Sequence, residues 1–188
     1  MRPLLVIVGG APATGKTTLA RELARRLHLA IVTKDDIKES LANAIGSGDR
    51  TRSRELGAAA YAVLFDVAAR TLEAGTGAVV EANFYRDESS EELHRLARLG
   101  DAMVVVCRSD AATRRARFAA RRGRHPVHLD GEILAHEWPD DDTKFALDIG
   151  VPRREIDTTR PELIDLDAIV AWISGEESSR TSVRRPVD

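Results

Sequence analysis

A glycine-rich segment at residues 10–17 constrains the fold of this chain more than any other feature. It reads Gly-Ala-Pro-Ala-Thr-Gly-Lys-Thr and follows the pattern G-x-x-x-x-G-K-[ST]. An apolar run at residues 4–8 comes directly before it, and a helical run at residues 18–29 follows. In such a strand–loop–helix frame, glycines let successive backbone N–H groups point at one anion, and the helix presents its positive dipole end to it. The segment therefore predicts a phosphate-binding loop.

The residues of this loop have distinct predicted tasks. Lys16 is expected to reach the β and γ phosphates of a nucleotide, and the Thr17 hydroxyl is expected to bind Mg²⁺. The alternative is a glycine turn with an ordinary surface lysine, and we favour the binding site because the full pattern lies in the right frame. The predicted nucleotide-binding residues of the loop are Gly10, Ala11, Pro12, Ala13, Thr14, Gly15, Lys16, Thr17 and Thr18.

Length and composition indicate one water-soluble domain. The 188 residues are enough to bury a real core, and 31% of them are charged. No apolar stretch approaches the ~20 residues that span a membrane, and Met1-Arg2-Pro3 leads straight into a strand, so we expect no membrane association and a cytoplasmic location. The formal net charge of −2 does not indicate a protein that binds nucleic acid mainly through positive charge.

Strand-like and helix-like segments alternate along the chain, which predicts an α/β fold with a parallel sheet and helices on both faces. The expected strands are residues 4–8, 30–33, 78–81, 103–107 and 154–157, whose apolar residues run on, as in strands covered on both sides. The expected helices are residues 16–27, 36–44, 54–74, 89–99, 111–121 and 165–173. The predicted domain spans residues 1–174, and residues 175–188 are expected to form a disordered tail.

Two further features are assigned to the core. The only cysteine, Cys107, ends an apolar run and is interpreted as a small buried hydrophobic residue. Tyr61, Leu64, Phe65 and Val67 form an apolar stripe on the longest expected helix, and we expect core packing rather than a substrate pocket.

A second informative segment, residues 33–39, follows the second expected strand. Ligands bind at the carboxyl ends of strands in open parallel sheets, so this segment should share an edge with the phosphate loop. Asp35 is the candidate for the base that accepts a proton from an attacking hydroxyl, whereas Asp36 fits a first-turn acid or cap of the next helix. The alternative is that both aspartates cap that helix. Lys34 or Lys38 could neutralise an anionic substrate, and an exposed helix face is the alternative for Lys38.

A third group of residues is rich in arginine. Arg114, Arg117 and Arg121 recur at spacings of three and four, which puts them on one face of the helix expected at 111–121. Arg117 and Arg121 are the pair expected to point into the cleft, where guanidinium groups can stabilise the charge that develops in phosphoryl transfer. A solvated basic face is the alternative for some of these arginines. The segment at about residues 121–137 is predicted to be a lid.

These segments together resemble the P-loop phosphotransferases, and the resemblance covers roughly residues 3–173. It is carried by residues 10–17, by Lys34-Asp35-Asp36, by the strand ending Val79-Val80-Glu81-Ala82-Asn83, and by the arginine-rich helix before Gly123. The most similar group contains chloramphenicol phosphotransferase, the kinase domain of polynucleotide 5′-kinases, gluconate kinase and zeta-toxin-like kinases. The resemblance implies a P-loop NTPase fold with strand order 2-3-1-4-5 and ATP with Mg²⁺ as cofactors. It also implies that Asp35 is the base and that Arg121, with Arg117 and Arg122 nearby, is the lid arginine.

Glu81 and Asn83 end the third strand of this resemblance. Many P-loop proteins have an aspartate at the first position, where it meets Mg²⁺ through water, and a glutamate could serve the metal in the same way or contact the substrate. Asn83 points to the same side of an extended chain and is a candidate substrate contact, with a turn residue as the alternative. The resemblance implies that the loop after the last strand runs beside the adenine, which makes Thr158 and Arg160 candidates for base or ribose contacts. We favour the alternative of a polar loop in which Asp157 or Thr158 caps a turn.

The sequence therefore predicts an ATP-dependent kinase that phosphorylates a hydroxyl group of a small molecule. The predicted catalytic residues are Lys16, Asp35, Arg121 and Arg117; the substrate residues are Asp35, Lys38, Glu81 and Asn83; the metal residues are Thr17 and, through water, Glu81. A polynucleotide 5′-hydroxyl kinase and a nucleotide-binding switch without transfer are the alternatives. A nucleoside monophosphate kinase is disfavoured because a carboxylate base would repel a phosphate acceptor. The sequence does not indicate the acceptor or the oligomeric state.

Overall fold

Five parallel strands form the central sheet of the computed structural model, which describes residues 2–139 and 142–175. The strands lie in the order β2-β3-β1-β4-β5, which confirms the predicted order. Their bounds are β1 Leu4–Gly10, β2 Ala30–Thr33, β3 Ala78–Glu81, β4 Asp101–Arg108 and β5 Arg153–Asp157. All five carboxyl ends therefore meet along one edge of the sheet, where ligands bind in folds of this class.

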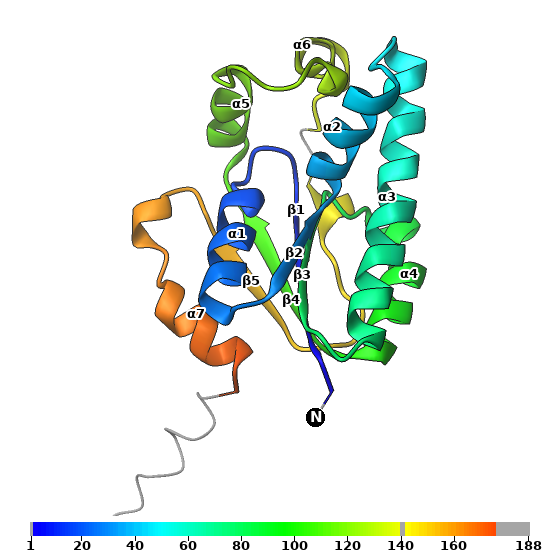
Figure 1. Ribbon diagram of the computed structural model, residues 1–188. Helices are drawn as coiled ribbons and strands as arrows, with labels where there is room; N and C mark the ends of the chain where they lie inside the picture. The colour runs from blue at the N-terminus through cyan, green and yellow to red at the C-terminus, as the bar shows by residue number, and fades with distance from the viewer. Residues whose placement is uncertain (1, 140–141, 176–188) are drawn as a thin grey trace, which may run out of the picture.

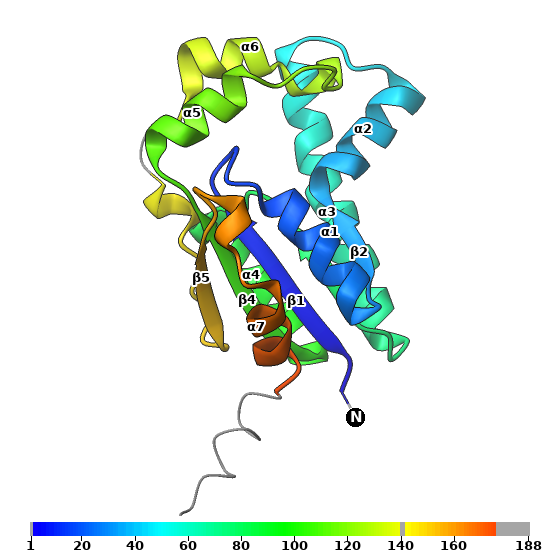
Figure 2. The same cartoon turned by 90° about the vertical axis from the view of Figure 1, so that its left-hand side faces the viewer.

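Helices cover both faces of the sheet. Helices α1 (Lys16–Leu27) and α7 (Leu166–Ile173) lie on one face, and α3 (Arg50–Glu73) and α4 (Arg86–Leu99) lie on the other (Figure 1). The remaining helices lie beyond the carboxyl edge of the sheet or in its connections, as Figure 2 shows for α2, α5 and α6. They are α2 Lys34–Ile45, α5 Ala111–Ala119, α6 Asp130–Glu132 and the short turns η1 Pro126–His128, η2 Ile133–Glu137, η3 Thr143–Phe145 and η4 Pro161–Leu163.

The central strand β1 is apolar on both of its faces. Leu5 and Ile7 pack into the cluster under α3 and α4, whereas Val6 and Val8 pack into the cluster under α1 and α7. Because successive side chains of a strand point to opposite faces, a continuous apolar run is what such a central strand requires. The prediction that both faces of every strand are covered holds less well for the edge strands β2 and β5. Side chains of β2 and β5 are partly exposed, since each edge strand has a neighbour on one side only.

Several helix boundaries differ from the predicted ones. Helix α2 begins at Lys34 instead of residue 36, because the Thr33 hydroxyl accepts a hydrogen bond from the Asp36 N–H (3.2 Å) and so acts as the N-cap. Asp36 is thus a first-turn acid and not the cap. Helix α3 begins at Arg50 instead of residue 54 because Asp49 caps it, and α5 ends at Ala119, two residues before the predicted end.

The predicted lid segment folds into short helical turns above the sheet edge. Val127 packs in a small cluster with Ala42 of α2 and Leu56 of α3. The lid therefore rests on α2 and α3, although it follows α5 in the chain. The predicted tail lies outside the described residues except for Gly175. Among the described residues, none of the helices combines the length and apolar character needed to span a bilayer.

The apolar stripe on α3 lies mainly in the core, as predicted. Leu64 is fully buried and Phe65 is nearly so, and the Tyr61 ring stacks on Phe65 at 6.1 Å between ring centroids. Val67 contradicts the prediction, because its side chain is 39% exposed. The buried face of a long helix against a sheet is narrower than the run of apolar residues suggests.

The burial of α3 gives a stability prediction. Leu64→Ala removes a side chain that has no exposed surface and should lower the free energy of unfolding by about 2–5 kcal/mol, because a cavity remains in the core. The preceding Val63 is 39% exposed, and Val63→Ala should change the stability by no more than about 0.5 kcal/mol. Urea unfolding of both variants measures the difference. Equal losses would show that α3 does not pack on the sheet as described.

Candidate active site

The glycine-rich loop joins the end of β1 to the start of α1. Gly10 has a φ of 143°, and a Cβ built on it would lie 2.4 Å from the Cys107 carbonyl of β4, so only glycine allows this close approach. Ala13 and Gly15 also have positive φ values of 63° and 82°. A Cβ on Gly15 would meet nothing within 4 Å. The loop therefore curls tightly against β4 and leaves open space on its outer side, as a phosphate cradle requires.

Lys16 and Thr17 meet Glu81 at the carboxyl end of β3. The Thr17 hydroxyl donates to Glu81 Oε2 (3.2 Å), and the Lys16 ammonium lies 3.9 Å from Glu81 Oε1 and donates to the Ala11 carbonyl (3.3 Å). Burial lowers the pKa of Lys16 and raises the pKa of Glu81, and their mutual attraction offsets part of both shifts. Lys16 and Glu81 are buried and Thr17 is half-buried, and the three side chains form a compact polar group in which a hydroxyl and a carboxylate, both oxygen ligands suited to Mg²⁺, lie together.

Thr158, directly after β5, anchors the loop from the other side. Its hydroxyl donates to the Thr14 carbonyl, and its hydroxyl and backbone N–H both lie 2.7 Å from the Arg108 carbonyl at the end of β4. The Asp157 carboxylate accepts from the Thr159 N–H (2.8 Å), which is the turn-capping role favoured from the sequence. Thr158 is 2% exposed, so its hydroxyl serves the protein backbone in this structure and not a base or ribose.

A cavity of about 830 Å³ lies beside the outer face of the loop and of α1. Two sides of it are polar, from Lys16 and Thr17 on the loop and from Arg117 and Arg121 near α5, and a third side is apolar, from Pro161, Ile164 and Leu166. Its size and its mixed lining suit a nucleotide whose phosphates meet the loop. The lining residues are Ala13, Gly15, Lys16, Thr17, Thr18, Leu19, Arg21, Glu22, Arg25, Arg117, Arg121, Thr158, Pro161, Ile164 and Leu166.

The four arginines around the end of α5 have different surroundings. Arg117 donates to the carbonyls of Thr158 and Thr159 (both 2.9 Å) and is thereby fixed at the wall of the larger cavity. Arg114 is buried, donates to the Pro139 carbonyl (3.2 Å) and lies over the Trp138 ring, so it serves packing. Arg121 lies past the helix end, over the Phe118 ring at 4.4 Å from its centroid. Arg122 is exposed and donates to the carbonyls of Ala119 and Arg121.

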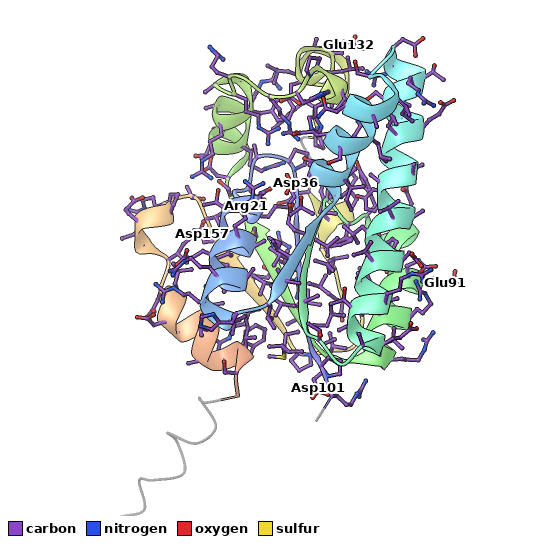
Figure 3. The ribbon with its side chains drawn as sticks, viewed as in Figure 1. Arg21, Asp36, Glu91, Asp101, Glu132 and Asp157 are labelled. Atoms are coloured by element: carbon purple, nitrogen blue, oxygen red, sulfur yellow. The ribbon has the colours of Figure 1, made fainter. Side chains whose placement is uncertain are left out.

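Asp35 lies between α2 and the lid. One carboxylate oxygen accepts from the Lys34 ammonium (3.2 Å) and the other accepts from the Arg124 guanidinium. Burial alone would raise the pKa of Asp35, but the positive charges of Lys34 and Arg124, with His128 and Lys16 behind them, hold it well below its usual range. Arg124 was not predicted as a site residue, because only the folded lid brings it to α2, 89 positions earlier in the chain. Asp36 points away and pairs with Arg21 at the surface (3.0 Å; Figure 3).

A second cavity of about 220 Å³ lies between the loop, α2 and the lid. It contains the predicted substrate residues Asp35, Lys38 and Asn83, whereas Glu81 lies next to it at Thr17. The Asn83 side-chain oxygen is buried and has no hydrogen-bond partner among the described residues. The lining residues are Pro12, Lys16, Thr17, Lys34, Asp35, Lys38, Asn83, Tyr85, Phe118, Arg121, Arg124, His128, Asp130, Ile133, Pro139 and Lys144. Lys16, Thr17 and Arg121 line both cavities, so they lie where the two spaces meet.

Comparisons with known proteins identify the family. A family model described as an AAA domain (AAA_33) matches residues 5–137. The chain belongs to this AAA domain family. A solved structure described as a "putative kinase" from Chloroflexus aurantiacus is 34% identical to this AAA domain protein, with a TM-score of 0.82 over 93% of this chain and 98% of that chain. No curated protein matches the sequence.

More distant structures share the fold of this AAA domain protein. A sugar kinase from Janibacter sp. HTCC2649 is 14% identical, with a TM-score of 0.57 over 93% of this chain and 95% of that chain. A gluconokinase from Sinorhizobium meliloti 1021 is also 14% identical, with a TM-score of 0.55 over 97% and 98%. These comparisons confirm the predicted resemblance to P-loop phosphotransferases and the P-loop fold.

The anchoring of the loop by Thr158 gives a prediction for the AAA domain protein. Thr158→Val keeps the shape of the side chain but leaves the buried Thr14 carbonyl without its donor, so it should cost about 1–3 kcal/mol of stability and weaken nucleotide binding. Thr159→Val is the matched control, since its hydroxyl contacts Ser109 and Asp110 instead of the loop. Thermal unfolding with and without nucleotide measures both effects. Equal behaviour of the two variants would contradict the anchoring role.

Proposed function

We propose that this protein is an ATP-dependent kinase that transfers the γ-phosphate to a hydroxyl group of a small molecule. One observation carries the proposal: the phosphate loop and Asp35 line the same cavity, so a phosphoryl group and a carboxylate base could face one acceptor there. The kinase structures of similar fold and the 34% identical protein support it. The P-loop kinase family generally uses ATP and Mg²⁺.

The proposed reaction is a direct displacement at the γ-phosphorus. The acceptor oxygen forms a bond to phosphorus, the bond from phosphorus to the bridging β–γ oxygen breaks, ADP leaves, and the acceptor proton passes to an Asp35 oxygen. Bound ATP would supply the phosphoryl group, and Mg²⁺ would neutralise part of the phosphate charge. Lys16 and the loop amides would hold the phosphates, and Thr17 and, through water, Glu81 would hold the metal. Asn83 offers the acceptor a hydrogen-bonding amide.

Arginine supplies the remaining positive charge in this proposal. Arg121 lines both cavities and so lies where the transferring phosphoryl group would pass, which fits the role of the lid arginine. Arg117 is proposed to contact the nucleotide. Its guanidinium donates to the carbonyls of Thr158 and Thr159 and lines the larger cavity. A small-molecule acceptor is favoured over a polynucleotide because the lid closes over a cavity of only about 220 Å³. The cytoplasmic location stays a prediction.

Removal of the loop lysine tests the proposed catalysis. Lys16→Ala should lower acceptor-stimulated ATP consumption by about 10²-fold or more, because the charge that holds the transferring phosphate is lost. Its melting temperature should fall by a smaller measure, because the buried Glu81 loses its cationic partner but is already favoured by burial to take up a proton. Steady-state kinetics and thermal unfolding on the same preparation measure both. An unchanged rate in a folded variant would refute the proposed mechanism.

The role of Asp35 is tested against its neighbour. ATP consumption with Mg²⁺ should be measured across sugars, aminoglycosides, nucleosides and 5′-hydroxyl oligonucleotides. Asp35→Asn should lower the acceptor-stimulated rate by about 10²–10⁴-fold, because the amide cannot accept the proton. Asp36→Asn alters the exposed pair with Arg21 and should leave the rate unchanged within about threefold. Tight nucleotide binding without stimulation by any acceptor would favour the nucleotide-binding switch instead.

A further inference from the structure

The smaller cavity is lined by far more positive than negative charge. Besides Lys16 and Arg121, which the proposed function assigns to the nucleotide, the Lys and Arg side chains in its lining are Lys34, Lys38, Arg124 and Lys144. The carboxylates in the same lining are Asp35 and Asp130. A neutral polyol gains nothing from this excess of cations, whereas an anion would be attracted by it.

Lys38 is a buried cation of this group and has no carboxylate partner among the described residues. Its side chain is 7% exposed, and its ammonium donates to the Ser53 hydroxyl (2.8 Å), which in turn donates to the Val127 carbonyl of the lid (2.6 Å). Among the described residues, no carboxylate lies within ion-pair distance of this ammonium. An ammonium carries three N–H donors, so the contact to Ser53 leaves two for a ligand. Lysines are almost never buried unless they are paired.

The lowered pKa of Lys38 is consistent with a site that would bind an anion beside the ammonium. Burial and the charges of Lys34 and Arg124 together lower the pKa of Lys38 to about 8, because Asp35 and Asp130 offset only part of their effect. The ammonium is therefore present near neutral pH at a cost in free energy. An anion beside it would remove that cost.

The same anion would improve Asp35 as a base. In the structure both Asp35 oxygens are held, one by Lys34 and the other by Arg124, and its pKa is lowered accordingly. A carboxylate with a very low pKa is a poor proton acceptor. An anionic group that draws Arg124 and Lys34 toward itself would release an oxygen of Asp35 and raise its proton affinity.

We propose that the acceptor is a small hydroxylated molecule that also carries an anionic group, a carboxylate or a phosphate, and that Lys38 and Arg124 bind this group. The proposal rests on the function proposed above for the same site. The anionic group of the acceptor lies against α2 and the lid, and its hydroxyl lies between Asp35 and the phosphate loop. Ser53 positions the Lys38 ammonium, and the Val127 carbonyl positions Ser53.

The scarcity of lysine allows a direct test by NMR. The chain has only four lysines, Lys16, Lys34, Lys38 and Lys144, so lysine labelled with ¹³C at Cε yields four signals, which single substitutions assign. With Mg²⁺ and a non-hydrolysable ATP analogue on the loop, inorganic phosphate and, separately, acetate should shift the Lys38 signal and raise its pKa from about 8. Sorbitol, a neutral polyol, should do neither. A stronger response to phosphate or to acetate tells which anionic group the site prefers.

Matched variants separate binding from packing. Lys38→Met keeps the length of the side chain without its charge. It should weaken the binding of whichever of phosphate and acetate shifts the Lys38 signal by about tenfold or more. Lys38→Gln is a second neutral variant with the same expected result. Arg70→Gln is the control, because it removes an equal charge from the exposed side of α3, where Arg70 pairs with Asp66. It should leave the affinity unchanged.

The outcomes are distinct for the two proposals. If neither anion moves the Lys38 signal, or if Lys38→Met and Arg70→Gln weaken binding equally, the anionic acceptor is refuted, even where a neutral acceptor is phosphorylated. If the anion binds through Lys38 while no acceptor stimulates ATP consumption, the anion site stands and the kinase proposal fails. The rate of ATP consumption can also be compared for the neutral sorbitol and for the anionic gluconate and sorbitol 6-phosphate. A rate with sorbitol at least as high as with both anions would refute the anionic acceptor. Turnover with gluconate or sorbitol 6-phosphate but not with sorbitol would support it.

Discussion

The buried contact of Lys16 and Thr17 with Glu81 is the interaction on which the candidate site depends. It joins the loop after β1 to the end of β3 and holds a lysine and a glutamate where water cannot stabilise either charge. Each would be costly alone, because a buried charge needs a partner. The pair is tolerated since each side chain compensates the other, and the 3.9 Å separation leaves the ammonium only loosely paired and free to meet a phosphate.

The rest of the loop is held by backbone contacts rather than by charge. Gly10 lets the loop pass within van der Waals distance of β4, and Thr158 ties the Thr14 carbonyl to the end of the same strand. Arg117 then fixes the segment after β5 through two carbonyls. These contacts come from three strands, so the shape of the loop is set by the sheet beneath it. Such preorganisation is what electrostatic catalysis of phosphoryl transfer requires.

The lid is joined to α2 and α3 mainly by polar contacts. His128 meets Glu39 (2.7 Å), Ser53 meets the Val127 carbonyl, and Arg50 meets Glu132 (3.1 Å), the last at the outer end of the lid in Figure 3. The apolar part of this contact is small and centres on Val127. Each such polar contact adds little net stability, so this segment is held less firmly than the apolar core of the sheet. The residues that close the cavity thus also supply its charge.

The sequence by itself determined the strand–loop–helix unit, the order of the elements and the side of the sheet on which Glu81 and Asp35 lie. These follow from local patterns, because apolar periodicity and glycine spacing act over a few residues. Only the tertiary structure decided which cations line the smaller cavity. It decided that Lys38 is buried. It also brought Arg124 to Asp35, 89 positions away, and Thr158 to Thr14, 144 positions away. Such contacts depend on how the lid and the last strand pack, and no short-range pattern encodes that packing.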